Sequence, residues 1–141
     1  MSNKTILLVE DNPDDETLML RALKKNNILN EVTVARDGAQ ALEHLFNGPS
    51  AGLPLPSIIL LDLQLPKIDG LEVLRRIRAG ERTQAIPVVV LTSSKLQEDI
   101  IESYRDGANA FVRKPVSFSD LATAMNAIGM FWLRLNEVAA N

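Results

Sequence analysis

The sequence predicts a doubly wound α/β fold around a five-stranded parallel sheet, and three features predict it. Short apolar runs rich in β-branched residues recur along the chain, as is typical of strands buried on both faces of a parallel sheet. Amphipathic stretches separate these runs, and such alternation favours right-handed crossover helices. The length of 141 residues, with 46% hydrophobic and 23% charged content, suits one domain with its own core.

Five strands and the helices between them can be placed along the chain. The strands are predicted near residues 5–10, 31–35, 57–62, 86–92 and 109–113. The first helix is expected to begin with Asn12 as its N-cap and Pro13 at the first helical position. Acidic residues that complement the helix dipole fill its first turn: Asp14, Asp15 and Glu16. The core faces of the first four helices are expected to use Leu18, Ala22 and Leu23; Ala41, Leu42, Leu45 and Phe46; Val73, Leu74 and Ile77; and Ile100, Ile101 and Tyr104.

Composition and charge exclude several classes of protein. The net charge of −3 gives no electrostatic basis for binding nucleic acid or an anionic membrane. The chain has no cysteine, which excludes disulfides and thiolate metal ligands. No apolar stretch approaches the roughly 20 residues of a membrane span, and the first strand begins too early to leave room for a secretory signal. We therefore expect a cytoplasmic protein.

Residues able to bind or transfer a phosphoryl group follow four of the predicted strands. They are Glu10 and Asp11, Asp62, Thr92 with Ser93, and Lys114. Because ligands bind beyond the carboxyl ends of parallel strands, we expect these side chains to converge at one edge of the sheet. Taken singly, each has a structural explanation as a helix cap, a turn former or a solvated lysine. Their shared position at the same end of the strands favours one site.

The chemistry of these groups suits phosphoryl transfer. Clustered carboxylates repel one another unless a cation lies among them, and a set of oxygen ligands favours Mg²⁺. A carboxylate can also act as a nucleophile and form an aspartyl phosphate. We expect Lys114 and the Thr92 hydroxyl to hold oxygens of the transferred group.

These residues resemble the pattern of the CheY-like receiver domains of two-component response regulators, over residues 4–128. The matching positions are Glu10-Asp11, Asp62, Thr92 and Lys114-Pro115 at the ends of four strands, with Pro66 and Asp69-Gly70 in the loop after Asp62. The resemblance implies a flavodoxin-like sheet of strand order 2-1-3-4-5 with five flanking helices. It also implies that a histidine kinase phosphorylates Asp62.

A ligand set for Mg²⁺ follows from the same resemblance. Asp11 and Asp62 would bind the ion directly, the Gln64 main-chain carbonyl would add a ligand, and Glu10 would act through water. The Lys114–Pro115 peptide bond would be cis.

Two departures from the commonest receiver pattern bear on the site and its switch. Glu10 stands where an aspartate is usual, so its side chain is one methylene longer. Phe111 stands where a tyrosine is frequent and has no hydroxyl, so any switching between Thr92 and Phe111 must be steric.

Within the family the chain looks most like the single-domain regulators that partner bacterial and cyanobacterial phytochromes. The residues that carry this likeness are Val9 to Pro13, the Pro-rich stretch before residue 57, Ser103-Tyr104, Gly107 to Ala110, and Phe131 to Leu133. The implied partner is a histidine kinase, with phytochromes as the candidate class. Because no effector domain follows the receiver in this sequence, we expect the signal to pass to another protein.

Other functions remain as alternatives. A haloacid-dehalogenase-type phosphatase also uses an aspartate nucleophile and Mg²⁺, but it requires a second acid where this chain has Gln64. A receiver fold that only binds partners, without taking up phosphate, is a further alternative. The single histidine, His44, is expected on a helix surface rather than in a phosphotransfer site.

The C-terminal part of the chain predicts an extension beyond the receiver domain, which we place at residues 1–128, with residues 129–141 as the extension. Apolar residues spaced three and four apart form a stripe: Phe118, Leu121, Met125, Ile128, Trp132 and Leu135. A single helix over residues 117–138 would be roughly 33 Å long, longer than the roughly 17–20 Å of a typical strand. We predict a homodimer with contacts at Phe131 and Trp132; the alternative is a tail that folds onto its own domain, with a bend at Gly129.

Overall fold

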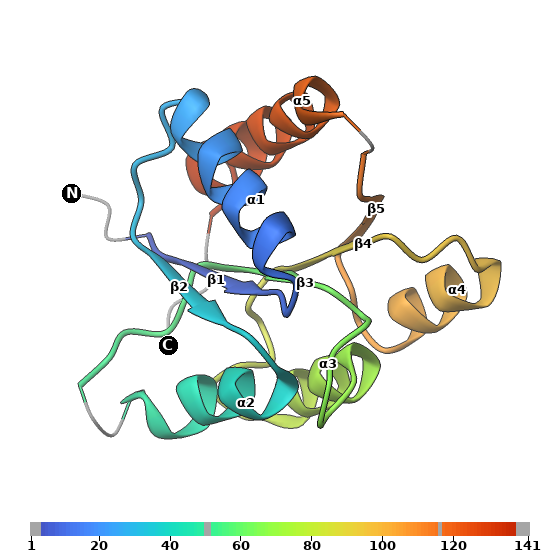
Figure 1. The fold of residues 1–141 in the computed structure, drawn as a ribbon. Helices are drawn as coiled ribbons and strands as arrows, with labels where there is room; N and C mark the ends of the chain where they lie inside the picture. The colour runs from blue at the N-terminus through green and yellow to red at the C-terminus, as the bar shows by residue number, and fades with distance from the viewer. Residues whose placement is uncertain (1–3, 50–51, 116, 138–141) are drawn as a thin grey trace.

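The computed structural model describes residues 4–49, 52–115 and 117–137, and these residues form alternating strands and helices (Figure 1). The elements are β1 (Ile6–Val9), α1 (Pro13–Lys25), β2 (Val32–Ala35), α2 (Gly38–Asn47), β3 (Ile58–Leu61), α3 (Gly70–Ala79), β4 (Val88–Thr92), α4 (Gln97–Arg105), β5 (Ala110–Arg113), α5 (Phe118–Ile128) and the π-helix η2 (Gly129–Leu135).

The five strands form one parallel sheet in the order β2-β1-β3-β4-β5, which confirms the predicted fold class and strand order. The register aligns the ends of the central strands, since Val9 pairs with Ala35 on one side and with Leu61 on the other. The loops that follow β1 and β3 therefore leave the sheet at the same level.

Two apolar layers enclose the sheet, because successive side chains of a strand point to opposite faces. Ile6 and Leu8 of β1 join a core with α1 and α5, whereas Leu7 and Val9 join a core with α2 and α3. Figure 1 shows α1 beside α5 on one side of the sheet and α2 beside α3 on the other. Burial on both faces explains why the central strands β1 and β3 are apolar throughout.

The backbone around the end of β3 is held closely by the start of α3. Asp69 caps that helix by accepting a hydrogen bond from the Glu72 backbone N–H at 3.0 Å. A Cβ at Gly70 would lie 2.4 Å from the Asp62 carbonyl oxygen and 2.5 Å from Leu63 Cα. A residue without a side chain is therefore needed here to let the helix approach Asp62.

Three of the predicted helical faces need correction. In α1 the buried residues are Met19, Ala22 and Leu23, whereas Leu18 lies at the flank of the core and is only partly buried. Phe46 of α2 is 44% exposed, because its ring lies outside the core and covers Gly80, where an added Cβ would meet it at 2.7 Å.

The largest correction concerns α4, whose apolar residues were expected to face the core. Ile101 and Tyr104 are each 50% exposed, and Ser103 is the buried residue of this helix. Helix α4 packs beside β5, an edge strand whose own residues are only partly buried. The sheet therefore offers α4 little apolar surface, and a small polar residue makes the contact.

The C-terminal extension begins at Gly129, where the helix changes from α to π geometry, and it ends at Leu135. The predicted helix therefore ends earlier than residue 138, which lies outside the described residues. A Cβ at Gly129 would lie 2.3 Å from Ile28 Cδ1, so the glycine lets the helix approach the end of α1. The Lys4 ammonium donates hydrogen bonds to the Leu133 and Asn136 carbonyls at 2.9 and 3.1 Å.

The tail divides its apolar residues between its own domain and solvent. Leu133 is buried and Trp132 packs partly against the core formed with α1 and α5. Met130, Phe131 and Leu135 are 44%, 49% and 68% exposed. The Phe131 ring contacts Trp132 edge-on, with the ring centroids 4.8 Å apart.

Two further expectations can be compared with the backbone. All peptide bonds between described residues are trans, so the cis Lys114–Pro115 bond implied by the resemblance is wrong here; trans is the lower-energy form even before proline. Among the described residues, no helix combines the length and the apolar character needed to cross a membrane.

Candidate active site

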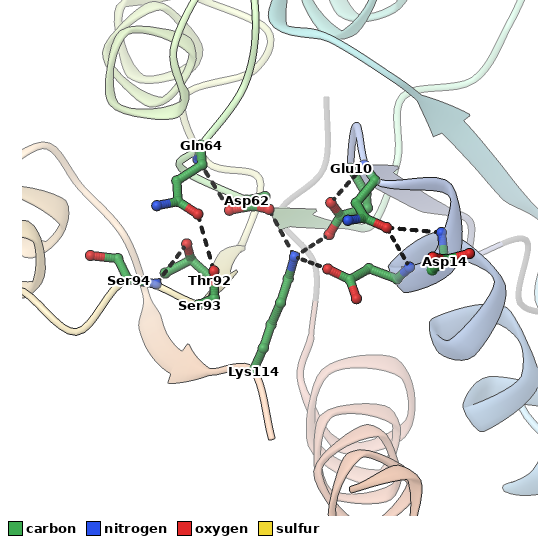
Figure 2. Close-up of polar contacts among 10 residues, drawn as sticks. Glu10, Asp14, Asp62, Gln64, Thr92, Ser93, Ser94 and Lys114 are labelled. Atoms are coloured by element: carbon green, nitrogen blue, oxygen red, sulfur yellow. Dashed lines mark hydrogen bonds and ion pairs between the residues drawn. The ribbon is translucent and has the colours of Figure 1, made fainter. Parts of the chain in front are cut away.

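The carboxyl ends of β1, β3, β4 and β5 meet around a cavity of about 410 Å³. Its lining residues are Glu10, Asp11, Asn12, Pro13, Asp15, Asp62, Gln64, Ser93 and Lys114. The structure thus brings together the two acids after β1, the aspartate after β3 and the lysine after β5. Figure 2 shows Lys114 reaching from β5 to lie between Glu10 and Asp62.

The ammonium of Lys114 lies among three carboxylates. Its Nζ is 2.6 Å from Glu10 Oε1, 2.8 Å from Asp62 Oδ2 and 2.9 Å from Asp15 Oδ2. The side chains of Glu10 and Asp62 are 0% and 4% exposed, and that of Lys114 is 11% exposed. Buried charges of this kind are retained only when they are paired, and the lysine supplies that pairing.

Burial and charge shift the protonation of this cluster. Burial raises the pKa of Glu10 to about 7, and the nearby Asp62 charge adds to the shift while Lys114 opposes it. Burial alone would lower the pKa of Lys114, but its contacts with the carboxylates of Asp62, Glu10 and Asp15 outweigh burial and raise that pKa. The lysine therefore remains charged at neutral pH.

The acidic residues suit a divalent cation. One carboxylate oxygen from each of Glu10, Asp11 and Asp62 can be chosen so that all three lie within 4.8 Å of one another. Asp11 is exposed to solvent, whereas Glu10 and Asp62 are buried behind it. A set of oxygen ligands fits a hard ion such as Mg²⁺ or Mn²⁺.

The longer side chain of Glu10 makes contacts on both sides of the site. Its Oε2 accepts a hydrogen bond from the Asn12 backbone N–H at 3.1 Å, while Oε1 faces Lys114. Glu10 therefore ties the end of β1 to both the start of α1 and the lysine that follows β5.

Asp62 is held so that its carboxylate faces the cavity. Its Oδ1 accepts a hydrogen bond from the Gln64 backbone N–H at 3.1 Å, and its Oδ2 faces Lys114 (Figure 2). The Gln64 side-chain oxygen accepts a hydrogen bond from Ser93 Oγ at 3.0 Å, so this side chain spans the loops after β3 and β4. A haloacid-dehalogenase-type phosphatase requires an acidic residue at this position, and Gln64 has an amide instead.

Thr92 lies at the end of β4 and is fully buried. The next residue, Ser93, lines the cavity instead. The Thr92 hydroxyl accepts a hydrogen bond from the Ser94 backbone N–H at 3.3 Å. Thr92 pairs with Arg113 in the sheet and Val90 pairs with Phe111. Since side chains alternate along a strand, Thr92 and Phe111 lie on the same face, and Phe111 is partly buried there.

Two side-chain contacts at the site are not apparent from the sequence. Asp15 was assigned only to the helix dipole, yet it pairs with Lys114. The sequence pairs Ser93 with Thr92 as a second hydroxyl, whereas in the structure Ser93 Oγ donates a hydrogen bond to the Gln64 side chain. One sequence feature could have indicated the role of Asp15. The N-cap Asn12 and Pro13 place Asp15 in the first turn of α1, and this turn lines the cavity.

Comparison with known proteins places the chain in a family. Residues 6–126 match the response regulator receiver domain. The chain belongs to that family. The receiver identity expected from the acidic pair, Asp62, Thr92 and Lys114 is therefore confirmed.

Similar proteins include two from curated sequences and two solved structures. The chain is 43% identical to the probable methanogenesis regulatory protein FilR2 of Methanothrix harundinacea, over 94% of this chain and 85% of that protein. It is 42% identical to the response regulator Rcp1 of Synechocystis, over 92% of this chain and 89% of Rcp1.

The crystal structure of the Mn²⁺-bound form of Rcp1 superposes on this receiver with a TM-score of 0.88 at 40% identity, covering 97% of this chain and 99% of that one. The crystal structure of the phosphorylated cyanobacterial phytochrome response regulator RcpA superposes with a TM-score of 0.91 at 38% identity. The match covers 99% of this chain and 100% of that one. The likeness to phytochrome response regulators is therefore confirmed.

The raised pKa of Glu10 generates a testable pH dependence for the metal-free receiver. Its ordinary value is 4.5 and its folded value is about 7, so the folded state binds the proton more tightly than the unfolded state. The stability that Glu10 contributes is fully present below pH 4.5 and is lost as pH rises through about 7. We expect urea denaturation in the presence of a chelator to give a lower free energy of unfolding at pH 7.5 than at pH 5.5, by about 1–3 kcal/mol.

Glu10→Gln provides the matched control, because it keeps the shape and removes the titration. The variant should show a much flatter dependence over the same range. The acids with lowered pKa values, Asp37 and Glu72, lose their contribution only at more acidic pH and do not interfere. An equal pH dependence in Glu10→Gln would contradict the assignment.

Proposed function

We propose that this receiver is a single-domain response regulator that takes up a phosphoryl group on Asp62 from a histidine kinase and signals to another protein. The observation that carries the proposal is the Asp62 carboxylate, which faces the cavity with Lys114 Nζ 2.8 Å from its Oδ2. A nucleophile and a fixed positive charge thus lie side by side where a phosphoryl donor can enter.

The transfer is a displacement at phosphorus. An oxygen of Asp62 forms a bond to phosphorus while the bond from phosphorus to the imidazole nitrogen of a kinase phosphohistidine breaks, and the electron pair stays on that nitrogen. Lys114 then holds an oxygen of the new phosphoryl group, because its ammonium lies at the carboxylate that is modified.

Mg²⁺ is the proposed cofactor. Asp11, Asp62 and the Gln64 main-chain carbonyl would hold it directly, with Glu10 acting through water; when bound, the ion supplies positive charge that offsets the phosphoryl oxygens. The donor set supports this choice, as does the Mn²⁺-bound form of the relative Rcp1.

A phytochrome is the proposed class of kinase. Support comes from the relatives, since RcpA is a cyanobacterial phytochrome response regulator whose structure matches 99% of this chain.

The Thr92 hydroxyl and Phe111 are the proposed switch. Thr92 is bonded to Ser94 N–H in this structure, so its hydroxyl must turn toward the cavity to reach a phosphoryl oxygen. That movement would alter the space beside Phe111 on the same face of the sheet, and with it the surface formed by α4, β5 and α5. The coupling depends on a difference in phosphate affinity between two conformations.

We also propose a homodimer through the C-terminal extension, with contacts that include Phe131 and Trp132. The exposed apolar residues of η2 support this, because Met130, Phe131 and Leu135 form part of one short helix. Trp132 is partly committed to its own core, so the exposed Phe131 is the stronger candidate contact.

Asp62→Asn should abolish phosphorylation, because an amide is not a competent nucleophile. Wild type and variant would be incubated with Mg²⁺ and acetyl phosphate, and intact mass would be measured before and after brief base treatment. We expect a base-labile phosphoryl adduct in the wild type alone. A wild type without any adduct would favour a receiver that only binds partners, and an equal adduct in Asp62→Asn would place the phosphate elsewhere.

Thr92→Ala should accept phosphate and yet lose most of the phosphorylation-dependent change in partner binding, because the hydroxyl that senses the phosphoryl group is gone. Binding to a captured partner would be compared with and without acetyl phosphate. Ser93→Ala is the control, since Ser93 bonds to Gln64 and not to the backbone of Ser94. Survival of the full change in Thr92→Ala would contradict this route.

Phe131→Glu should convert the proposed dimer into a folded monomer, because it places a charge on the exposed face of η2. Sedimentation velocity at tens of micromolar, in both phosphorylation states, would measure the association. Leu53→Glu is the control, an equally drastic change at a residue that is 48% exposed in the loop after α2. A monomeric wild type in both states would disprove the dimer.

A further inference from the structure

Asp15 is a cavity residue to which the proposed function gives no role. It lies in the first turn of α1, where its backbone N–H donates to Asn12 Oδ1 at 3.1 Å. Its Oδ2 is 2.9 Å from Lys114 Nζ. The N-cap therefore fixes the backbone that directs this carboxylate at the lysine.

The ammonium of Lys114 has three N–H donors, and three carboxylates surround it. Nζ donates hydrogen bonds to Asp15 and Asp62 and forms an ion pair with Glu10, so all three acids engage the lysine before any phosphate arrives. A phosphoryl group on Asp62 adds oxygens that need a donor, and the lysine must give up one existing partner to supply it. Phosphoryl uptake therefore includes a competition for Lys114.

Burial decides which partner is released. Glu10 is 0% exposed, and its release would leave a carboxylate without a counter-charge in a water-excluded position. Asp62 is 4% exposed and carries the phosphoryl group itself. Asp15 is 37% exposed, so water can solvate its carboxylate when the lysine leaves. Asp15 is the partner whose release costs least.

We propose that Asp15 is a positioning residue that competes with the incoming phosphoryl group for Lys114 Nζ and so slows phosphoryl uptake. The inference rests on the proposed phosphorylation of Asp62. It goes beyond it by assigning control of the uptake rate to a side chain outside the acceptor, the metal ligands and the switch.

The test compares two neighbouring substitutions that change the net charge equally. Asp15→Asn removes the competitor, whereas Asp14→Asn removes an exposed acid of the same helical turn whose side chain lies outside the cavity lining. Both lose the same favourable interaction with the helix dipole. With Mg²⁺ and acetyl phosphate, we expect Asp15→Asn to be phosphorylated about threefold faster than wild type, the size of a partly exposed ion pair, and Asp14→Asn to match wild type.

Two further variants separate positioning from a structural role. Asp15→Glu restores a carboxylate that can reach the lysine, and it should return the rate toward that of wild type. In a Lys114→Ala background, Asp15→Asn should no longer raise the rate. A merely structural contact between α1 and β5 would lower the melting temperature without accelerating phosphorylation.

The outcomes are distinct. A wild type that forms no adduct overturns the proposed function and, with it, this inference. A wild type that is phosphorylated while Asp15→Asn and Asp14→Asn react at equal rates overturns the role of Asp15 alone. An acceleration by Asp15→Asn that persists without Lys114 also overturns it, because the effect would then be general charge repulsion of the donor.

Discussion

The ammonium of Lys114 connects the parts of this receiver that would otherwise repel one another. It joins the end of β5 to Glu10 after β1, to Asp62 after β3 and to Asp15 in α1, all within 2.9 Å. Two of these acids are almost fully buried, so without the lysine they would carry uncompensated charge in a low-dielectric site. The ammonium of Lys114 thus offsets the negative charge that gathers at the carboxyl edge of the sheet.

The sheet makes that arrangement possible, because the register of its strands sets where each acid emerges. Val9 and Leu61 are paired, so the residues that follow them start at the same level. The start of α3 then approaches the backbone of Asp62 so closely that only glycine fits at position 70. The two apolar layers below the site hold the strands that carry Asp62 and Lys114, whereas Thr92 is buried and is not part of the cavity lining.

Two elements at the periphery contribute little apolar surface to the core. Helix α4 buries only a serine, so its Ile101 and Tyr104 remain exposed beside the edge strand β5. The π-helix η2 buries Leu133 and leaves Phe131 at the surface. Elements with little buried apolar surface change conformation at low cost, and this property is consistent with the switch surface proposed for α4 and β5.

The pattern of residues along the chain was enough to predict the sheet, its flanking helices and most of the acidic site. Strands buried on both faces must be apolar throughout, and the residues that end them meet at one edge, so Glu10, Asp11, Asp62 and Lys114 could be grouped from local pattern alone. Three features could be read only from the packed structure: the outward face of α4, the contact of Asp15 with Lys114, and the place of Ser93 rather than Thr92 in the cavity lining. These depend on the rotation and approach of packed elements and on the competition among neighbouring polar groups. The spacing of residues along one chain does not encode distances between side chains that packing brings together.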